Sequence, residues 1–85
     1  NRMNKLYELA LELMADIKQI ENAIGSLSGN GLESHYRLRT NSEVRGSYVY
    51  AKVRTSNYVK LLHAEKKDLE KDLKVVETKI KSLIN

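Results

Sequence analysis

The sequence predicts an α+β fold that is predominantly helical, in which two long antiparallel coiled-coil helices flank a β-hairpin. Three observations predict it. Apolar residues recur in steps of three and four in the first and last thirds of the chain, residues between them alternate with a period of two, and proline is absent. We expect a single domain over residues 1–85, with a helix over about 3–27, a β-hairpin over about 34–54 and a second helix over about 56–84.

The first helix is predicted from an uninterrupted heptad pattern. Its apolar positions are Met3, Leu6, Ala10, Leu13, Ile17, Ile20, Ile24 and Leu27. Gly25, Gly29 and Gly31 lie at the end of this pattern. Because glycine adopts positive φ without a Cβ clash, we expect these glycines to end the helix and turn the chain.

The second helix repeats the same pattern. Its apolar positions are Val59, Leu62, Leu69, Leu73, Val76, Ile80 and Leu83, and Lys66 alone places a charge at a position of the same series. A lone polar residue on a heptad seam can fix the register of two helices at some loss of stability. We therefore expect Lys66 to fix the register of the two helices.

The hairpin is predicted from two segments of period two, His35–Arg39 and Ser47–Arg54, separated by a polar stretch that contains a glycine. Alternate side chains of a strand share a face. One face is then apolar, with Tyr36, Leu38, Val49, Ala51 and Val53. The other carries His35, Arg37, Arg39, Tyr48, Tyr50, Lys52 and Arg54, with Arg45 near the tip.

This second face is the candidate partner-binding surface. Its predicted contact residues are Arg37, Arg39, Arg45, Tyr48, Tyr50, Lys52 and Arg54. Arginine and lysine neutralise phosphates while tyrosine rings stack on bases, so the pattern suits nucleic acid. It suits a protein partner equally, and basic and tyrosine residues are also ordinary on solvent-facing strands. The sequence leaves the three interpretations open.

A second apolar stripe lies beside the seam of the first helix, at Tyr7, Leu11 and Met14. Two helices and one small sheet cannot bury both stripes. We expect these three residues to form an oligomer interface in a homodimer or a larger helical bundle. The alternative is that they are scattered exposed residues, which are common.

The sequence contains no pattern typical of a metal, cofactor or catalytic site. There is no cysteine, and His35 and His63 stand 28 residues apart without a carboxylate at ligand spacing, so we expect no metal, no cofactor and no catalytic site. No apolar run has the length of a membrane span, and we expect a cytoplasmic protein that binds neither a membrane nor a small-molecule substrate.

These observations predict a non-enzymatic binding protein. Its size and composition are similar in style to small phage or mobile-element proteins that act as inhibitors or adaptors of a larger machine. A nucleic-acid-binding module that uses the same hairpin is the first alternative. A purely structural or chaperone-like coiled coil is the second, because the order of two long helices around a hairpin resembles the chaperone prefoldin in topology, without a shared motif.

Overall fold

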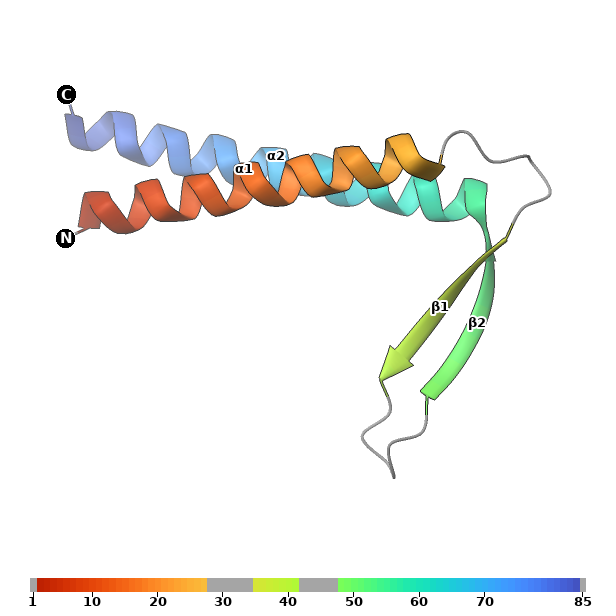
Figure 1. The fold of residues 1–85 in the computed structure, drawn as a ribbon. Coiled ribbons are helices and arrows are strands. Elements are labelled where there is room, and N and C mark those ends of the chain that lie inside the picture. The colour runs from red at the N-terminus through yellow and green to blue at the C-terminus, as the bar shows by residue number, and fades with distance from the viewer. Residues whose placement is uncertain (1, 28–34, 42–47, 85) are drawn as a thin grey trace.

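The computed structural model describes residues 2–27, 35–41 and 48–84, with the backbone alone described for residues 39–41, 48 and 49. The order of elements is α1 (Arg2–Leu27), β1 (His35–Asn41), β2 (Tyr48–Arg54) and α2 (Thr55–Ile84), as shown in Figure 1. The predicted architecture of two helices flanking an antiparallel hairpin is confirmed, and the fold is predominantly helical.

The two helices run antiparallel and form the only core of the described part of the chain. Ala10 and Leu13 of α1 pack with Val76 and Ile80 of α2, and partly buried leucines of both helices close around them. All four core residues belong to the predicted heptad positions. None of the described side chains is completely buried, because a pair of helices covers each seam residue from one side only.

The molecule is elongated and thin. Its radius of gyration is 17.3 Å and its principal extents are 52 × 36 × 15 Å. A compact domain of this length has a radius of gyration of about 12 Å. The smallest extent is close to the diameter of one helix with its side chains, about 10–12 Å, so the helix pair is a single layer with two open faces.

The helix pair has two different ends (Figure 1). At one end α1 begins and α2 ends, and we call it the terminal end. The hairpin extends from the opposite end, the hairpin end, and points to one side of the helix axis. The described elements therefore place the hairpin and the terminal end at opposite extremes of the helix pair.

Gly25 does not end the first helix as predicted. It lies inside α1, which continues to Leu27, and it has an exposed, helical position where an added Cβ would meet nothing within 4 Å. The seam continues through Ile24 and Leu27, both partly buried. Burial of these residues outweighs the cost of about 0.5–1 kcal/mol for glycine within a helix. Gly29 and Gly31 lie outside the described residues.

The second strand continues directly into the second helix. β2 ends at Arg54 and α2 begins at Thr55, which is buried. Tyr36 of β1 stacks on Tyr58 in the first turns of α2, with ring centroids 4.5 Å apart and ring planes at 19°. Aromatic pairs in this geometry contribute about 0.5–1.5 kcal/mol beyond the area that they bury. The continuous backbone and the stacked rings together set the direction of the hairpin.

Lys66 occupies its predicted seam position. It is partly exposed, and its Nζ lies 3.2 Å from Oε2 of Glu21 on α1. The ion pair thus joins the two helices between the core cluster and the hairpin end. It is partly solvated, and pairs of this kind contribute about 0–1 kcal/mol.

Candidate binding surfaces

The hairpin register gathers bases on one face. His35 pairs with Arg54, and Arg37 pairs with Lys52. Because residues directly opposite in an antiparallel pair share a face, these four residues lie on the same side of the sheet. All four are exposed. We call this surface the basic face, defined by His35, Arg37, Tyr50, Lys52 and Arg54.

Tyr50 lies on the basic face, in contact with the side chain of Arg37. The guanidinium carbon of Arg37 lies 4.9 Å from the centroid of the Tyr50 ring. The two residues are diagonal neighbours across the strands, a spacing that long and aromatic side chains can span. A guanidinium over an aromatic face is held by the quadrupole of the ring. The Tyr50 ring therefore orients Arg37, while 52% of Tyr50 stays exposed.

Three other predicted contact residues are described less completely. By backbone register, Arg39 pairs with Tyr50 and Tyr48 pairs with Asn41. The side chains of Arg39 and Tyr48 lie outside the described residues, as does the whole of Arg45. The described part of the predicted site thus consists of Arg37, Tyr50, Lys52 and Arg54.

The opposite face of the hairpin is more apolar. Leu38 and Val53 are partly buried there, whereas Tyr36 and Ala51 are exposed. Tyr36 is exposed by 41% even though it stacks on Tyr58. The hairpin is thus covered only where it meets the first turns of α2.

The second predicted surface lies on α1. Tyr7, Leu11 and Met14 are exposed by 44%, 64% and 47%. They follow the helix at spacings of four and three residues, beside the buried positions Ala10 and Leu13. We call these three residues the α1 stripe. Its apolar side chains are only partly covered by the rest of the chain.

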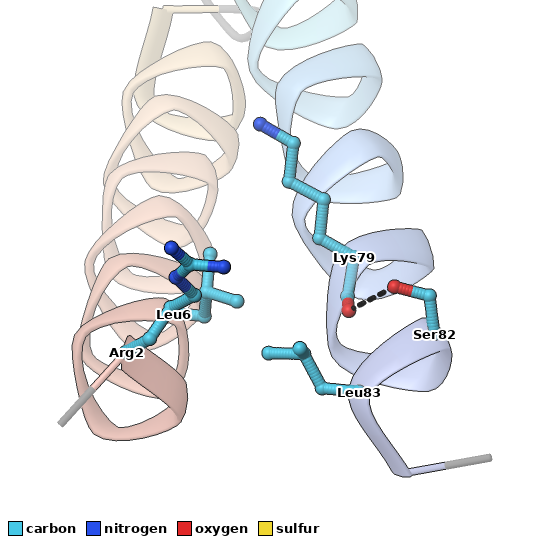
Figure 2. Close-up of a pocket in the computed structure, with 5 residues that line it drawn as sticks. All are labelled: Arg2, Leu6, Lys79, Ser82 and Leu83. Atoms are coloured by element: carbon cyan, nitrogen blue, oxygen red, sulfur yellow. Dashed lines mark hydrogen bonds between the residues drawn. The ribbon is translucent and has the colours of Figure 1, made fainter.

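A shallow pocket lies between the helices at the terminal end (Figure 2). Arg2 and Leu6 of α1 face Lys79 and Leu83 of α2, and the Ser82 hydroxyl donates a hydrogen bond of 2.8 Å to the Lys79 carbonyl. The pocket lies where the seam between α1 and α2 reaches the terminal end. It contains no acid–base pair, and we assign it no ligand.

Sequence reasoning missed the concentration of apolar surface at this end. Leu9 and Leu83 are both 42% exposed, although Leu83 is a heptad position. Leu83 lies in the last turn of α2, where the helix pair ends and no further turn covers it. The position of Leu83 in the last turn of the predicted helix was the sequence feature that could have indicated its exposure.

Two kinds of feature are relevant to binding among the described residues: groups of metal-binding side chains and membrane-spanning helices. No group of three histidine, aspartate or glutamate side chains within residues 2–27, 35–41 and 48–84 could hold a metal ion. Neither α1 nor α2 contains a stretch long and apolar enough to cross a membrane.

Comparison with known proteins gave no match among protein-family models, curated proteins or solved structures. The topological resemblance to prefoldin gains no support from these comparisons. Function must therefore be inferred from the two surfaces themselves.

Proposed function

We propose that this chain is a non-enzymatic binding protein that self-associates through its helices and presents the basic face of its hairpin to an acidic surface of a protein partner. One observation carries the proposal. The two paired strands contain no aspartate or glutamate, and their exposed bases lie together on one side. A single domain that offers such a surface suits an inhibitor or adaptor of a larger assembly, the role of many small phage and mobile-element proteins.

The position of the basic face supports this role. The hairpin contacts only α2 among the described elements, so the basic face extends away from the helix pair. A projecting two-stranded ribbon can enter a groove that a flat surface cannot. Complementary charges steer such encounters and exclude partners of the wrong sign. The hairpin is thus suited to an acidic groove.

The tyrosines favour a protein over single-stranded nucleic acid. Single-stranded nucleic acid binds by stacking bases on open aromatic rings. Here the Tyr36 ring is stacked on Tyr58, and Arg37 lies over the Tyr50 ring. Tyr36 belongs to the apolar face, and Tyr50, the ring of the basic face whose side chain is described, is already in contact with Arg37.

A nucleic-acid-binding module is the second candidate. The same row of bases favours it, because arginine and lysine neutralise phosphates as readily as carboxylates. Double-stranded nucleic acid needs no free aromatic ring, and the hairpin has the dimensions of a ribbon that fits the major groove of DNA.

Self-association is supported by the surface that the chain exposes. The total accessible surface is 7028 Å². A compact monomer of 9.8 kDa exposes about 5,200 Å². The excess of about 1,800 Å² is larger than the roughly 800 Å² that each partner contributes to a standard interface. We place this interface on the α1 stripe and describe the helix pair as an antiparallel coiled coil.

One capture experiment tests the function. The immobilised protein is exposed to lysate of the cell of origin, with and without nuclease, and eluted with rising NaCl. We expect a protein that is retained after nuclease treatment and released by salt, because the Debye length falls from about 10 Å at 0.1 M to about 3 Å at 1 M. Loss of capture after nuclease treatment would show that the partner is nucleic acid and not protein. No salt-sensitive capture in either arm would refute the binding role and leave a structural one.

A further inference from the structure

The exposed apolar residues of the helices are concentrated at the terminal end. Eight large hydrophobic side chains of the described helical residues are exposed by more than 40%. They are Tyr7, Leu9, Leu11, Met14, Leu61, Val75, Leu83 and Ile84. Seven of them lie in the terminal halves of α1 and α2, and only Leu61 lies toward the hairpin end.

The hairpin half of the helix pair has a different surface. The exposed positions of α1 in this half are Ala15, Asp16, Lys18, Gln19, Glu21, Asn22, Gly25 and Ser26. The exposed positions at the start of α2 include Ser56, Asn57, Lys60, His63, Glu65 and Lys67. Burying this half against a second copy would desolvate charged and polar groups without a fixed partner, which is unfavourable.

We propose that two copies associate through their terminal halves in opposite directions, so that the two hairpins lie at opposite ends of the dimer. This inference rests on the self-association proposed above and adds its orientation. The α1 stripe of each copy packs on the α1 stripe of the other around a two-fold axis close to Leu11. Such an interface is self-complementary, as a two-fold dimer requires.

The alternative is a parallel dimer with both hairpins at one end. In that arrangement the helices face each other along their whole length, so the polar hairpin halves are buried together with the terminal halves. Each charged residue of α1 then lies beside its own copy, including Lys18, whose two copies lie about 21 Å apart along the helix axis in the opposed dimer. Like charges placed side by side are destabilising. In the opposed arrangement with the axis at Leu11, residue 2 of one copy lies level with residue 20 of the other, so α1 beyond residue 20 stays uncovered.

The orientation has a functional consequence. In the opposed dimer the two basic faces are separated by the length of two hairpin halves, so they cannot enter one groove together. Each dimer is then bivalent and can bridge two partner molecules or two distant sites on one assembly. Bivalent binding raises the overall affinity only where the spacing of the two sites matches that of the two modules.

The separation of the hairpin ends can be calculated from helix geometry. Val76 packs in the same cluster as Ala10, so it marks the level of the proposed axis on α2. Lys60 is exposed and lies 16 residues from Val76. At 1.5 Å per residue this is about 24 Å, so two Lys60 positions lie about 48 Å apart along the opposed dimer. In a parallel dimer they lie within about 30 Å, because at most three helix-to-helix spacings of 8–10 Å separate them.

Spin labels measure this separation directly. The chain contains no cysteine, so Lys60→Cys and, independently, Ser26→Cys each place one label per chain at an exposed helical position near the hairpin. We expect double electron–electron resonance to give a distance near about 48 Å for Lys60→Cys and near about 45 Å for Ser26→Cys. Circular dichroism and light scattering of each labelled protein confirm that it is folded and associated.

The outcomes separate the orientation from the rest of the proposed function. Distances near the expected values support the opposed dimer. Distances below about 30 Å in both proteins overturn the opposed orientation and leave self-association in place. A mass of 9.8 kDa with no dipolar signal overturns self-association itself. None of these results depends on whether the basic face binds an acidic partner, which the capture experiment measures separately.

Discussion

Leu11→Ala should weaken self-association more than any other single truncation of the α1 stripe. Leu11 is 64% exposed in the single chain, the highest value among the large hydrophobic side chains of the described residues. In the proposed opposed dimer Leu11 lies next to the two-fold axis, where it meets Leu11 of the other copy. Truncation leaves the core of the helix pair unchanged, because Leu11 is not part of that core.

The expected size follows from the exposed fraction. Leu11→Ala removes three carbon atoms, and burial of each is worth about 0.8 kcal/mol. With 64% of the side chain still to be covered, the loss is about 1.5 kcal/mol per chain and about 3 kcal/mol per dimer. The dissociation constant of the dimer should then rise about 150-fold, or about 10-fold if the interface covers half of this area.

Sedimentation equilibrium over a range of micromolar concentrations measures this change. Leu61→Ala is the matched control, because Leu61 is 58% exposed on α2 but lies toward the hairpin end. It should leave the dissociation constant unchanged. A change of less than about threefold for Leu11→Ala, or an equal change for Leu61→Ala, would show that the interface lies elsewhere.

Three further predictions concern the fold itself. Gly25→Ala should stabilise the chain by about 0.5–1 kcal/mol and raise its Tm by several degrees, because the position is helical and open; a lower Tm would show that glycine is required there. Tyr58→Ala should speed amide hydrogen exchange in β1 and β2 without changing that of the core cluster, since it removes the stacking on Tyr36; unchanged exchange in the strands would show that the backbone junction alone holds the hairpin. Lys66→Leu should raise the free energy of unfolding in urea by about 1 kcal/mol, because it completes the apolar seam; a loss of stability would assign a larger role to its pair with Glu21.

The element order and the two faces of the hairpin could be predicted because they follow from local periodicity. Apolar spacing of three and four residues fixed both helices to within one residue of their observed bounds. Strand alternation placed Arg37 and Lys52 on the same face, and the structure shows that they pair directly. The prediction for Gly25 was wrong for an energetic reason. Local glycine preference is worth about 1 kcal/mol, and burial of Leu27 and Ile24 along the seam outweighs it.

The direction of the hairpin could not be predicted from periodicity. It depends on the contact between Tyr36 and Tyr58, which are 22 residues apart, and on a strand that becomes a helix without an intervening loop. The position of Arg37 over Tyr50 likewise depends on the exact pairing register. Such contacts arise from tertiary geometry, whereas a one-dimensional pattern gives only which residues share a face.

The central claim is that the basic face of the hairpin is the binding surface, and a charge-matched pair of variants tests it. The first variant combines Arg37→Thr, Lys52→Thr and Arg54→Thr, which keeps residues that favour strands. The control combines Lys60→Gln, Lys67→Gln and Lys71→Gln on exposed positions of α2. Both variants lower the net charge by three, and solvent-facing changes of this kind usually shift stability by less than about 0.5 kcal/mol each.

The decisive measurement is the amount of the salt-sensitive partner that each protein captures from nuclease-treated lysate. Circular dichroism and sedimentation first establish that both variants keep the helicity and oligomeric state of the original chain. We expect the variant changed at Arg37, Lys52 and Arg54 to lose capture of this partner and the control to retain it. Equal capture by both variants would contradict the account, because the binding surface would then lie outside the basic face.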